Sequence, residues 1–106
     1  MSSANPTDWL EVEGKARRRI LTHTPDMMVV EVEFSEGGWG PQHSHPHVQA
    51  TYVRSGRFEF DVEGEKKQVG AGDSLIMPPN AKHGCTVLEA GTLIDVFSPA
   101  REDFLA

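Results

Sequence analysis

The sequence has a single cysteine and no long run of apolar residues. One thiol, Cys85, excludes an intrachain disulfide. No apolar stretch approaches the roughly 18 residues that a membrane-spanning helix requires, so we expect no such helix. Residues 1–6 lack the charged and then apolar pattern of a secretory signal. Together these absences predict a cytoplasmic protein without a membrane anchor.

Positive charge is also scarce. The 106 residues include 10 lysines and arginines against 16 aspartates and glutamates, which gives a net charge of -6. This balance argues against nucleic acid as a partner, because phosphate binding needs a basic surface. The run Arg17, Arg18, Arg19 is a local exception, and we interpret it as strand residues with solvated charges rather than as an anion site. At this length the whole chain, residues 1–106, is expected to form one domain.

Amphipathic helical periodicity is absent before the C-terminus, whereas short segments with period-two alternation recur. Phe58, Phe60 and Val62 alternate with acidic residues, which is typical of a strand with one buried face. The expected strands are 9–12, 16–24, 27–35, 49–54, 57–63, 66–69, 74–77, 83–88 and 92–97. The last two are expected to form a hairpin through 89–91, and 99–105 a single helical turn. This succession predicts an all-β fold, either a barrel or a sandwich.

The segment 92–97 is apolar on both faces. Ile94 and Val96 lie on one face, and Leu93 and Phe97 lie on the other. A strand buried on both sides fits a barrel wall that also packs against something outside the barrel. We therefore expect a homodimer.

Two histidine-bearing segments carry the strongest chemical signal. The first reads G-x5-H-x-H-x3-Q-x6-G over 37–56, and the second reads G-x5-P-x-N-x2-H over 72–83. His43 and His45 are two residues apart, so on an extended strand both imidazoles leave the same face, and Gln49 keeps that parity. His83 arrives from the second segment. Three imidazoles and an amide oxygen converging inside a barrel would form a divalent-metal site with positions left for a ligand.

This spacing resembles the two motifs of the cupin superfamily, G-x5-H-x-H-x3/4-E-x6-G and G-x5-P-x-G-x2-H-x3-N. The resemblance implies a small single-domain cupin, a double-stranded β-helix or jelly-roll barrel, with metal-binding motifs at 37–56 and 72–87. The chain departs from the pattern at Gln49, Asn80 and Val87. Gln49 is the instructive departure, because an amide oxygen leaves the full charge of a divalent ion in place where a carboxylate would lower it. Such a site is a stronger Lewis acid, suited to an anionic ligand and to electrophilic rather than redox chemistry.

A narrower resemblance lies in two stretches, HSHPHVQ over 43–49 and LIDVFSPAREDF over 93–104. Both are similar to the small pectin-degradation cupins of the KdgF type. Those proteins convert 4,5-unsaturated monouronates, released by pectate and alginate lyases, to linear 4-deoxy-5-keto uronates. The resemblance implies that one divalent metal ion is bound by His43, His45, Gln49 and His83. It also implies catalytic or substrate-binding roles for Asp95, Phe97 and Arg101.

Two side chains beside the motifs are open to more than one interpretation. His47 shares the parity of His43 and His45, but Pro46 interrupts the strand register, so we interpret His47 as peripheral rather than as a ligand. Cys85 shares the parity of His83. We interpret it as a small buried hydrophobic residue, with contact to the metal site as the alternative.

The residues outside the histidine motifs leave further alternatives. Asp95 stands between apolar neighbours, where a carboxylate is out of place without a partner or a purpose, so it is either paired with Arg101 or catalytic. Arg101 is either a surface residue or a bidentate clamp for a carboxylate. Phe97 either packs in the core or forms a wall that faces the substrate. Trp39 either lines the mouth of the site or caps the core.

The sequence thus predicts a metal-dependent, non-redox enzyme that opens the ring of a small unsaturated uronic acid and converts the resulting enol to a ketone. Asp95 would transfer protons and Arg101 would hold the carboxylate. The residues do not choose among nickel, zinc, manganese and iron as the bound ion. Two other functions fit the same motifs: a non-catalytic sugar-acid-binding or sensor cupin, and a metal-dependent dioxygenase.

Overall fold

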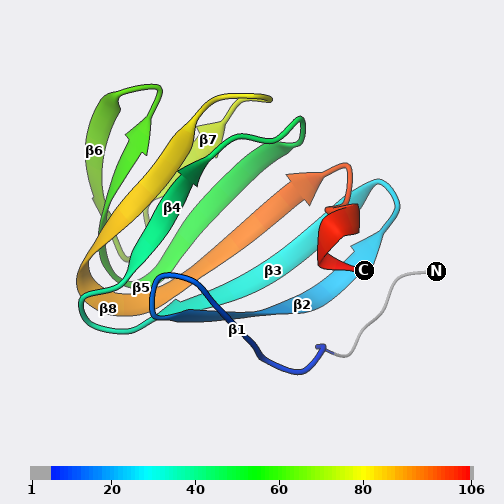
Figure 1. Ribbon diagram of the computed structural model, residues 1–106, viewed down its shortest axis with the longest axis horizontal. Helices are drawn as coiled ribbons and strands as arrows, with labels where there is room; N and C mark the ends of the chain where they lie inside the picture. The colour runs from blue at the N-terminus through cyan, green and yellow to red at the C-terminus, as the bar shows by residue number, and fades with distance from the viewer. Residues whose placement is uncertain (1–5, 106) are drawn as a thin grey trace.

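The protein is described by a computed structural model that covers residues 6–105. Within this range the chain forms eight strands and one short 3-10 turn (Figure 1). The elements are β1 (Leu10–Val12), β2 (Ala16–Thr24), β3 (Met27–Phe34), β4 (Trp39–His43), β5 (Val48–Val62), β6 (Glu65–Gly70), β7 (Ser74–Met77), β8 (His83–Ser98) and η1 (Glu102–Phe104). The expected all-β fold is confirmed. In the described residues no helix is long and apolar enough to cross a membrane.

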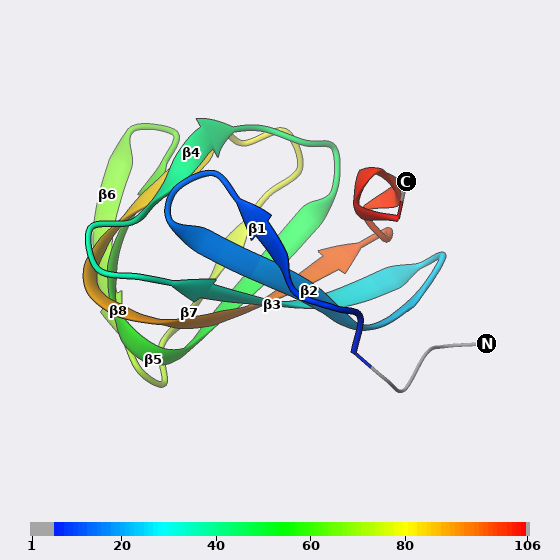
Figure 2. The same cartoon turned by 60° about the horizontal axis from the view of Figure 1, so that its bottom comes forward.

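All strand pairs are antiparallel, in the order β1-β2-β3-β8-β5-β6, with β4 paired to β8 and β7 paired to β5. The two long strands divide the structure into halves. The first part of β8 pairs with β4 and with the second part of β5, whereas the second part of β8 pairs with β3 and with the first part of β5. Figure 2 shows the sheet curving around so that the two halves face one another. This curvature encloses the interior.

Two expected turns are absent, because the chain continues through them as bent strands. We expected a turn at 55–56 and a hairpin at 89–91, but both positions lie inside β5 and β8, where the pairing register shifts between Val53 and Phe58. At this bend the two strands approach closely. A Cβ on Gly91 would overlap the backbone carbonyl of Ser55, and Gly56 adopts a positive φ of 83°. The glycines there allow the backbones of the two bent strands to approach closely, and the chain does not reverse at these positions.

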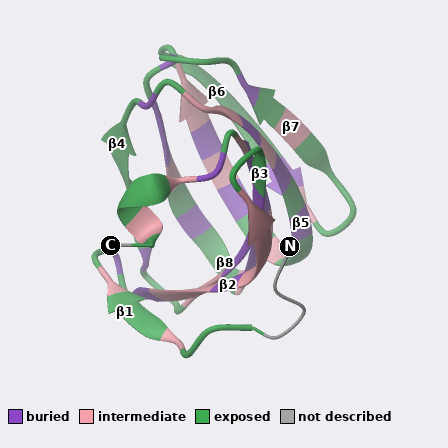
Figure 3. Ribbon diagram, turned by 90° about the vertical axis from the view of Figure 1, so that its right-hand side faces the viewer, coloured by how far each residue is buried: buried purple, intermediate pink, exposed green. Residues whose placement is uncertain are grey.

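The core occupies the concave side of the sheet in two clusters. One contains buried side chains from β5 to β8, including Val53, Phe58 and Met77. The other joins β2, β3 and the end of β8 through Ile20, Met28, Val30, Phe97 and Ala100. Figure 3 shows buried positions alternating with less buried positions along the strands, as period-two patterning predicts.

The outer face of β3 departs from this simple alternation. Glu31 alternates along β3 with the core residues Met28 and Val30, yet it is only 2% exposed. Its carboxylate forms ion pairs with Arg19 at 2.7 Å and with Arg54 at 3.1 Å. Arg19 comes from the neighbouring strand β2 and Arg54 from β5, on the far side of β8, so a charged residue is covered without facing the core.

The segment after β8 folds back beside the β2–β3 turn (Figure 1). The backbone N–H of Ala100 donates to the carbonyl of Pro25 at 3.1 Å, and Ala100 itself is buried. The expected C-terminal helical turn is present as η1. This anchoring brings Arg101 and Phe104 to the edge of the cavity described next.

Candidate metal centre and active site

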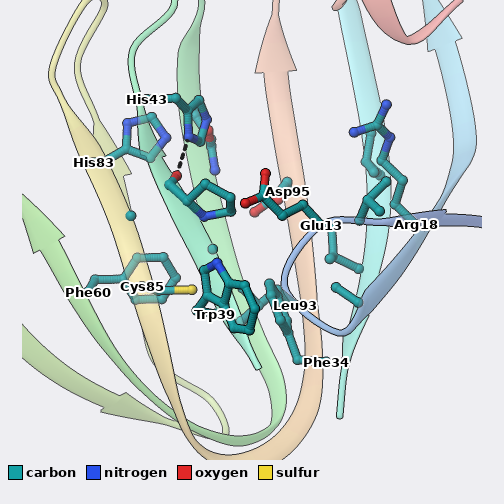
Figure 4. A pocket seen from close by; sticks show the side chains of 18 of the residues that line it. Glu13, Arg18, Phe34, Trp39, His43, Phe60, His83, Cys85, Leu93 and Asp95 are labelled. Atoms are coloured by element: carbon teal, nitrogen blue, oxygen red, sulfur yellow. Dashed lines mark hydrogen bonds between the residues drawn. The ribbon is translucent and has the colours of Figure 1, made fainter. Parts of the chain in front are cut away.

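A cavity of about 400 Å³ lies on the concave side of the sheet and is bordered by strands from both halves. Figure 4 shows His43 and His83 at one side of it, Arg18 at the other and Asp95 between them. Most of the residues singled out from the sequence line the cavity: His43, Gln49, His83, Asp95, Phe97, Arg101, Trp39 and Cys85. His45 completes the polar side, since its ring packs against those of His43 and His83.

Three imidazoles form a compact cluster. One ring nitrogen each of His43, His45 and His83 lies within 4.8 Å of the others, so these residues could hold one metal ion. His43 ends β4 and is paired with His83, the first residue of β8. The extended strand expected through His45 is not formed, because β4 ends at His43 and His45 lies in the following loop. The rings converge all the same, since the loop returns the chain toward β5.

The proton positions on the three rings leave the same nitrogen available in each. The Nδ1 atoms of His43, His45 and His83 lie 2.8, 3.0 and 3.0 Å from backbone carbonyl oxygens two residues away. A carbonyl only accepts a hydrogen bond, so each Nδ1 carries the proton and each Nε2 keeps its lone pair. Nε2 of His83 is buried and has no hydrogen-bond partner among the residues that the structure describes. A buried lone pair of this kind fits a metal ligand.

The side-chain oxygen of Gln49 points toward the three histidine rings. Its Oε1 is 3.0 Å from Nε2 of His45, which places two acceptors face to face. Burial lowers the pKa of His45, so a proton between them is disfavoured at neutral pH, whereas a cation would satisfy both atoms. The amide nitrogen of Gln49 donates to Oγ1 of Thr51 at 3.0 Å, and the Thr51 hydroxyl donates to Oδ1 of Asp95 at 2.7 Å. This chain of donors orients the Gln49 oxygen toward the histidines.

Burial also keeps the His83 ring uncharged. His83 is 3% exposed, and removal from solvent lowers its pKa to about 4. A neutral imidazole is the form that binds metal. The electrostatics and the hydrogen bonds therefore agree on a set of donors, three imidazoles and one amide oxygen, that fits a divalent ion.

Asp95 is the acidic group inside this polar region. It lies in the middle of β8, between Val30 of β3 and Thr51 of β5, and is 9% exposed. Burial raises the pKa of Asp95 to about 6, although the hydrogen bond from Thr51 acts in the opposite direction. The expected alternative, a pairing with Arg101, is not formed in the structure. Arg101 instead donates from Nε and Nη2 to the two carboxylate oxygens of Asp103, at 3.0 and 2.8 Å.

Phe97 belongs to the core and also lines the cavity. Its ring is 3% exposed and belongs to the second core cluster, yet it also packs edge-on against His45 at 5.7 Å between ring centroids. The guanidinium carbon of Arg101 lies 5.1 Å from the Phe97 ring centroid and 4.2 Å from that of Phe104. Two aromatic rings thus support the Arg101 side chain at the edge of the cavity.

The peripheral residues agree with their interpretations. His47 packs against His45 at 5.4 Å between ring centroids and lies outside the three-histidine cluster. Cys85 lines the cavity below the histidines (Figure 4), and burial raises the pKa of its thiol to about 12. Such a thiol stays protonated and acts as a small apolar side chain. Trp39 lines the cavity and is 42% exposed, which places it at the mouth.

Two residues of the site were missed. Thr51 lies two positions after Gln49 on β5, so strand parity alone would have placed both side chains on the inner face. Arg18 lies between Ala16 and Ile20 on β2, both buried, and its side chain lines the cavity. Our interpretation of Arg18 as a solvated strand residue was wrong, because parity with two core residues turns it inward.

The geometry defines a barrel with a histidine-lined interior, and comparison with known proteins gives its class. The cupin domain family matches residues 30–97. The chain therefore belongs to the cupin superfamily.

Within that superfamily its relatives include proteins of pectin breakdown. The chain is 44% identical to the pectin degradation protein KdgF of Dickeya dadantii (strain 3937), over 93% of this chain and 92% of that protein. It is 43% identical to the solved structure of KdgF from Halomonas sp., with a TM-score of 0.87 over 92% of this chain and 93% of that one. An RmlC-like cupin from Shewanella frigidimarina NCIMB 400 is 41% identical, with a TM-score of 0.89 over 92% of this chain and 88% of that one.

Proposed function

We propose that this protein is an enzyme that converts 4,5-unsaturated monouronates to linear 4-deoxy-5-keto uronates. The observation that carries the proposal is the hydrogen-bonded series Gln49, Thr51, Asp95, which puts a buried carboxyl group on the same polar wall as the three histidines. A site for ligand binding alone has no need of a buried carboxyl group at this position. The 44% identity to a pectin degradation protein supports the substrate class.

The proposed cofactor is one divalent metal ion, nickel, zinc, manganese or iron, held by His43, His45, His83 and Gln49. When bound, it would supply positive charge for the oxygen that becomes anionic during the reaction. The amide ligand does not neutralise part of that charge, unlike a carboxylate.

The reaction is an isomerisation in two proton transfers. In the first, the anomeric hydroxyl loses its proton, the bond between C1 and the ring oxygen breaks, and the ring oxygen gains a proton. This step leaves an aldehyde at C1 and an enol at C5. In the second, the enol oxygen loses its proton and C4 gains one, which gives the ketone. No atom is gained or lost.

Asp95 is the group placed to carry these protons. Its carboxyl group borders the cavity, and Thr51 holds Oδ1 in place by donating to it at 2.7 Å. A carboxylate so fixed would accept the proton of the anomeric hydroxyl and return it to the ring oxygen, and would then accept the enol proton and deliver it to C4. The Phe97 ring forms an apolar wall beside His45 and limits the entry of water, and Arg101 adds positive charge at the cavity edge.

The test is turnover of a lyase-generated unsaturated monouronate by the metal-loaded protein, followed as loss of the ultraviolet absorbance of its double bond. The spontaneous rate is subtracted. We expect acceleration by the wild-type protein, loss of that acceleration in Asp95→Asn with the metal still bound, and loss after treatment with a chelator.

Asp26→Asn is the matched control, because the exposed Asp26 lies in the β2–β3 turn away from the cavity. Full activity of Asp95→Asn would refute the role of Asp95. No acceleration by a fully metal-loaded wild-type protein would refute the proposed reaction and favour sugar-acid binding without turnover, or oxygen-dependent chemistry.

A homodimer in the cytoplasm remains our prediction. Its support is the outer surface of the second sheet half, where Ala50 is paired with Ile76 on one side and with Val96 on the other. Ile76 is 60% exposed and Tyr52 is 47% exposed. Light scattering on the purified protein gives the mass directly, and a monomer at micromolar concentration would contradict the prediction.

A further inference from the structure

Arg18 is an arginine that faces the cavity from the side opposite the histidines (Figure 4). It lies on β2, where its neighbours along the strand, Arg17 and Arg19, point to the other face. The guanidinium carbons of those two lie 4.1 and 4.4 Å from the centroid of the Trp9 ring. Alternation along one strand therefore places two of the three arginines outside the barrel and one inside it.

The donors of Arg18 are uncommitted, in contrast with those of the other arginines. Arg17 and Arg19 pair with glutamates of β3, Arg54 pairs with Glu31, Arg57 donates to Gln68, and Arg101 pairs with Asp103. Among the arginines of residues 6–105, only Arg18 has a guanidinium with neither a hydrogen bond nor an ion pair to another described residue.

The Phe104 ring holds the Arg18 guanidinium in place without using its N–H groups. The guanidinium carbon lies 3.7 Å from the ring centroid, within contact distance for a stacked pair. Stacking uses the flat face of the group and leaves the N–H donors at its edge free, in the geometry that binds a carboxylate through two parallel hydrogen bonds.

The charged groups around the Arg18 guanidinium also favour the binding of an anion. Arg101 lies over the same Phe104 ring, 4.2 Å from its centroid, so two guanidinium groups share one partly buried corner. Asp103 supplies a carboxylate to Arg101. Burial and the positive charge of Arg101 lower the pKa of Arg18, and the carboxylate of Asp103 only partly offsets them. Glu13, exposed, and Asp95, bound to Thr51, are the other acids of the cavity lining.

We infer that Arg18 makes the direct, two-hydrogen-bond contact with the carboxylate of the sugar acid, and that Arg101 acts at longer range because Asp103 occupies its donors. This inference rests on the proposed function for the identity of the sugar acid. It makes Arg18 the residue that distinguishes an acid from the corresponding neutral sugar.

The experiment compares metal-loaded Arg18→Gln with metal-loaded Arg17→Gln, a matched loss of charge one residue away on the outer face of β2. With unsaturated monouronate as substrate, we expect Arg18→Gln to raise KM by roughly 10- to 100-fold and to change kcat by less than about threefold, because the lost contact is present throughout the reaction. Arg17→Gln should match the wild type. Arg18→Lys keeps the charge but lacks the fork, so its KM should fall between those of the wild type and Arg18→Gln.

A second measurement keeps the inference separate from the proposed reaction. Binding of galacturonate and of galactose to the metal-loaded proteins is measured by calorimetry, which needs no turnover. The wild type should prefer the acid, Arg18→Gln should lose more of that preference than Arg101→Gln, and Arg17→Gln should keep it. If the wild type binds galacturonate through Arg18 but does not convert the unsaturated substrate, the proposed reaction fails and the inference stands.

Two results would overturn the inference. One is equal behaviour of Arg18→Gln and Arg17→Gln in both measurements. The other is loss of the preference for the acid in Arg101→Gln alone, which would transfer the contact to Arg101. A variant that does not fold is recognised by circular dichroism, and Arg18→Lys, which conserves the stem and the charge, then carries the test.

Discussion

Replacing Asp95 by asparagine is expected to make the metal-free protein more stable at alkaline pH. The ionised Asp95 carboxylate is buried beside apolar neighbours, and that burial raises its pKa to about 6 from an ordinary 3.8. The folded state therefore binds this proton more tightly than the unfolded state does. The stability that Asp95 contributes is fully present below about pH 3.8 and is lost as the pH rises through about 6.

The size of the effect follows from the two pKa values. A difference between 3.8 and about 6 corresponds to about 3 kcal/mol of folding free energy lost once the group is ionised. Asparagine carries no charge, and its oxygen can still accept the hydrogen bond from Thr51. Asp95→Asn should thus gain up to about 3 kcal/mol at pH 8, or up to roughly 12 to 15 °C in melting temperature, and the gain should shrink steadily toward pH 4.

Urea unfolding of chelator-treated protein, followed by tryptophan fluorescence at pH 8, 6 and 5, measures the difference. His83 has a pKa lowered to about 4, so its contribution to stability changes in the opposite sense, being lost as the pH falls through the interval from 6.5 to 4. Both proteins contain His83, so this contribution cancels when they are compared. Asp26→Asn at an exposed turn should show no gain at any pH.

Two outcomes would refute the reasoning. Asp95→Asn could be no more stable than the wild type at pH 8, which would mean that the ionised carboxylate is not disfavoured in the fold. The gain could also persist undiminished at pH 5, which would mean that it does not come from ionisation. The expected result would show that the protein maintains a destabilising group at this position, as is common for groups that serve a reaction.

Three further predictions concern the histidine cluster and the bend that β5 and β8 share near Gly91. His83→Ala should lower the metal content, measured by elemental analysis after dialysis, from about one ion per chain to nearly none while the far-ultraviolet circular dichroism is kept; full occupancy would contradict the assignment of His83. Thr51→Val removes the acceptor that orients the Gln49 amide and should weaken metal binding by roughly 10- to 100-fold, whereas Thr51→Ser should bind normally; equal affinities would show that the amide needs no such support. Gly91→Ala should lower the free energy of unfolding by more than about 2 kcal/mol because its Cβ overlaps a carbonyl of the facing strand, whereas Gly70→Ala, with ordinary contact distances, should cost much less; similar losses would argue against a tight crossing.

The sequence correctly predicted those features that depend on the spacing of nearby residues. The spacing of His43, His45 and Gln49, together with His83 behind its proline-containing turn, predicted a cluster that the structure brings within 4.8 Å for the histidine nitrogens. Period-two alternation predicted the all-β fold and most strand bounds, since side-chain direction along a strand depends only on residue number.

The residue types at two positions predicted turns that the structure does not have, because the strands continue through them. The segments 55–56 and 89–91 contain glycine, which is typical of turns, yet β5 and β8 continue through both as bent strands. Whether a glycine reverses the chain or allows two strands to approach closely depends on which backbone packs against it. For Gly91 that is the backbone at Ser55, 36 residues earlier in the numbering, and the sequence does not reveal it.

By itself the sequence determined which residue types are available: three imidazoles and an amide for a metal ion, and an acid in an apolar strand. Only the tertiary structure decided the partners. It joined Asp95 to Thr51 rather than to Arg101, paired Arg101 with Asp103, and left the Arg18 guanidinium facing the cavity with no hydrogen bond or ion pair inside residues 6–105. The physical reason is that hydrogen bonds and burial act over a few ångströms in space. The residues that share them here are separated by up to tens of positions along the chain, so the choice among several chemically suitable partners is made by strand register and by the fold that closes the barrel.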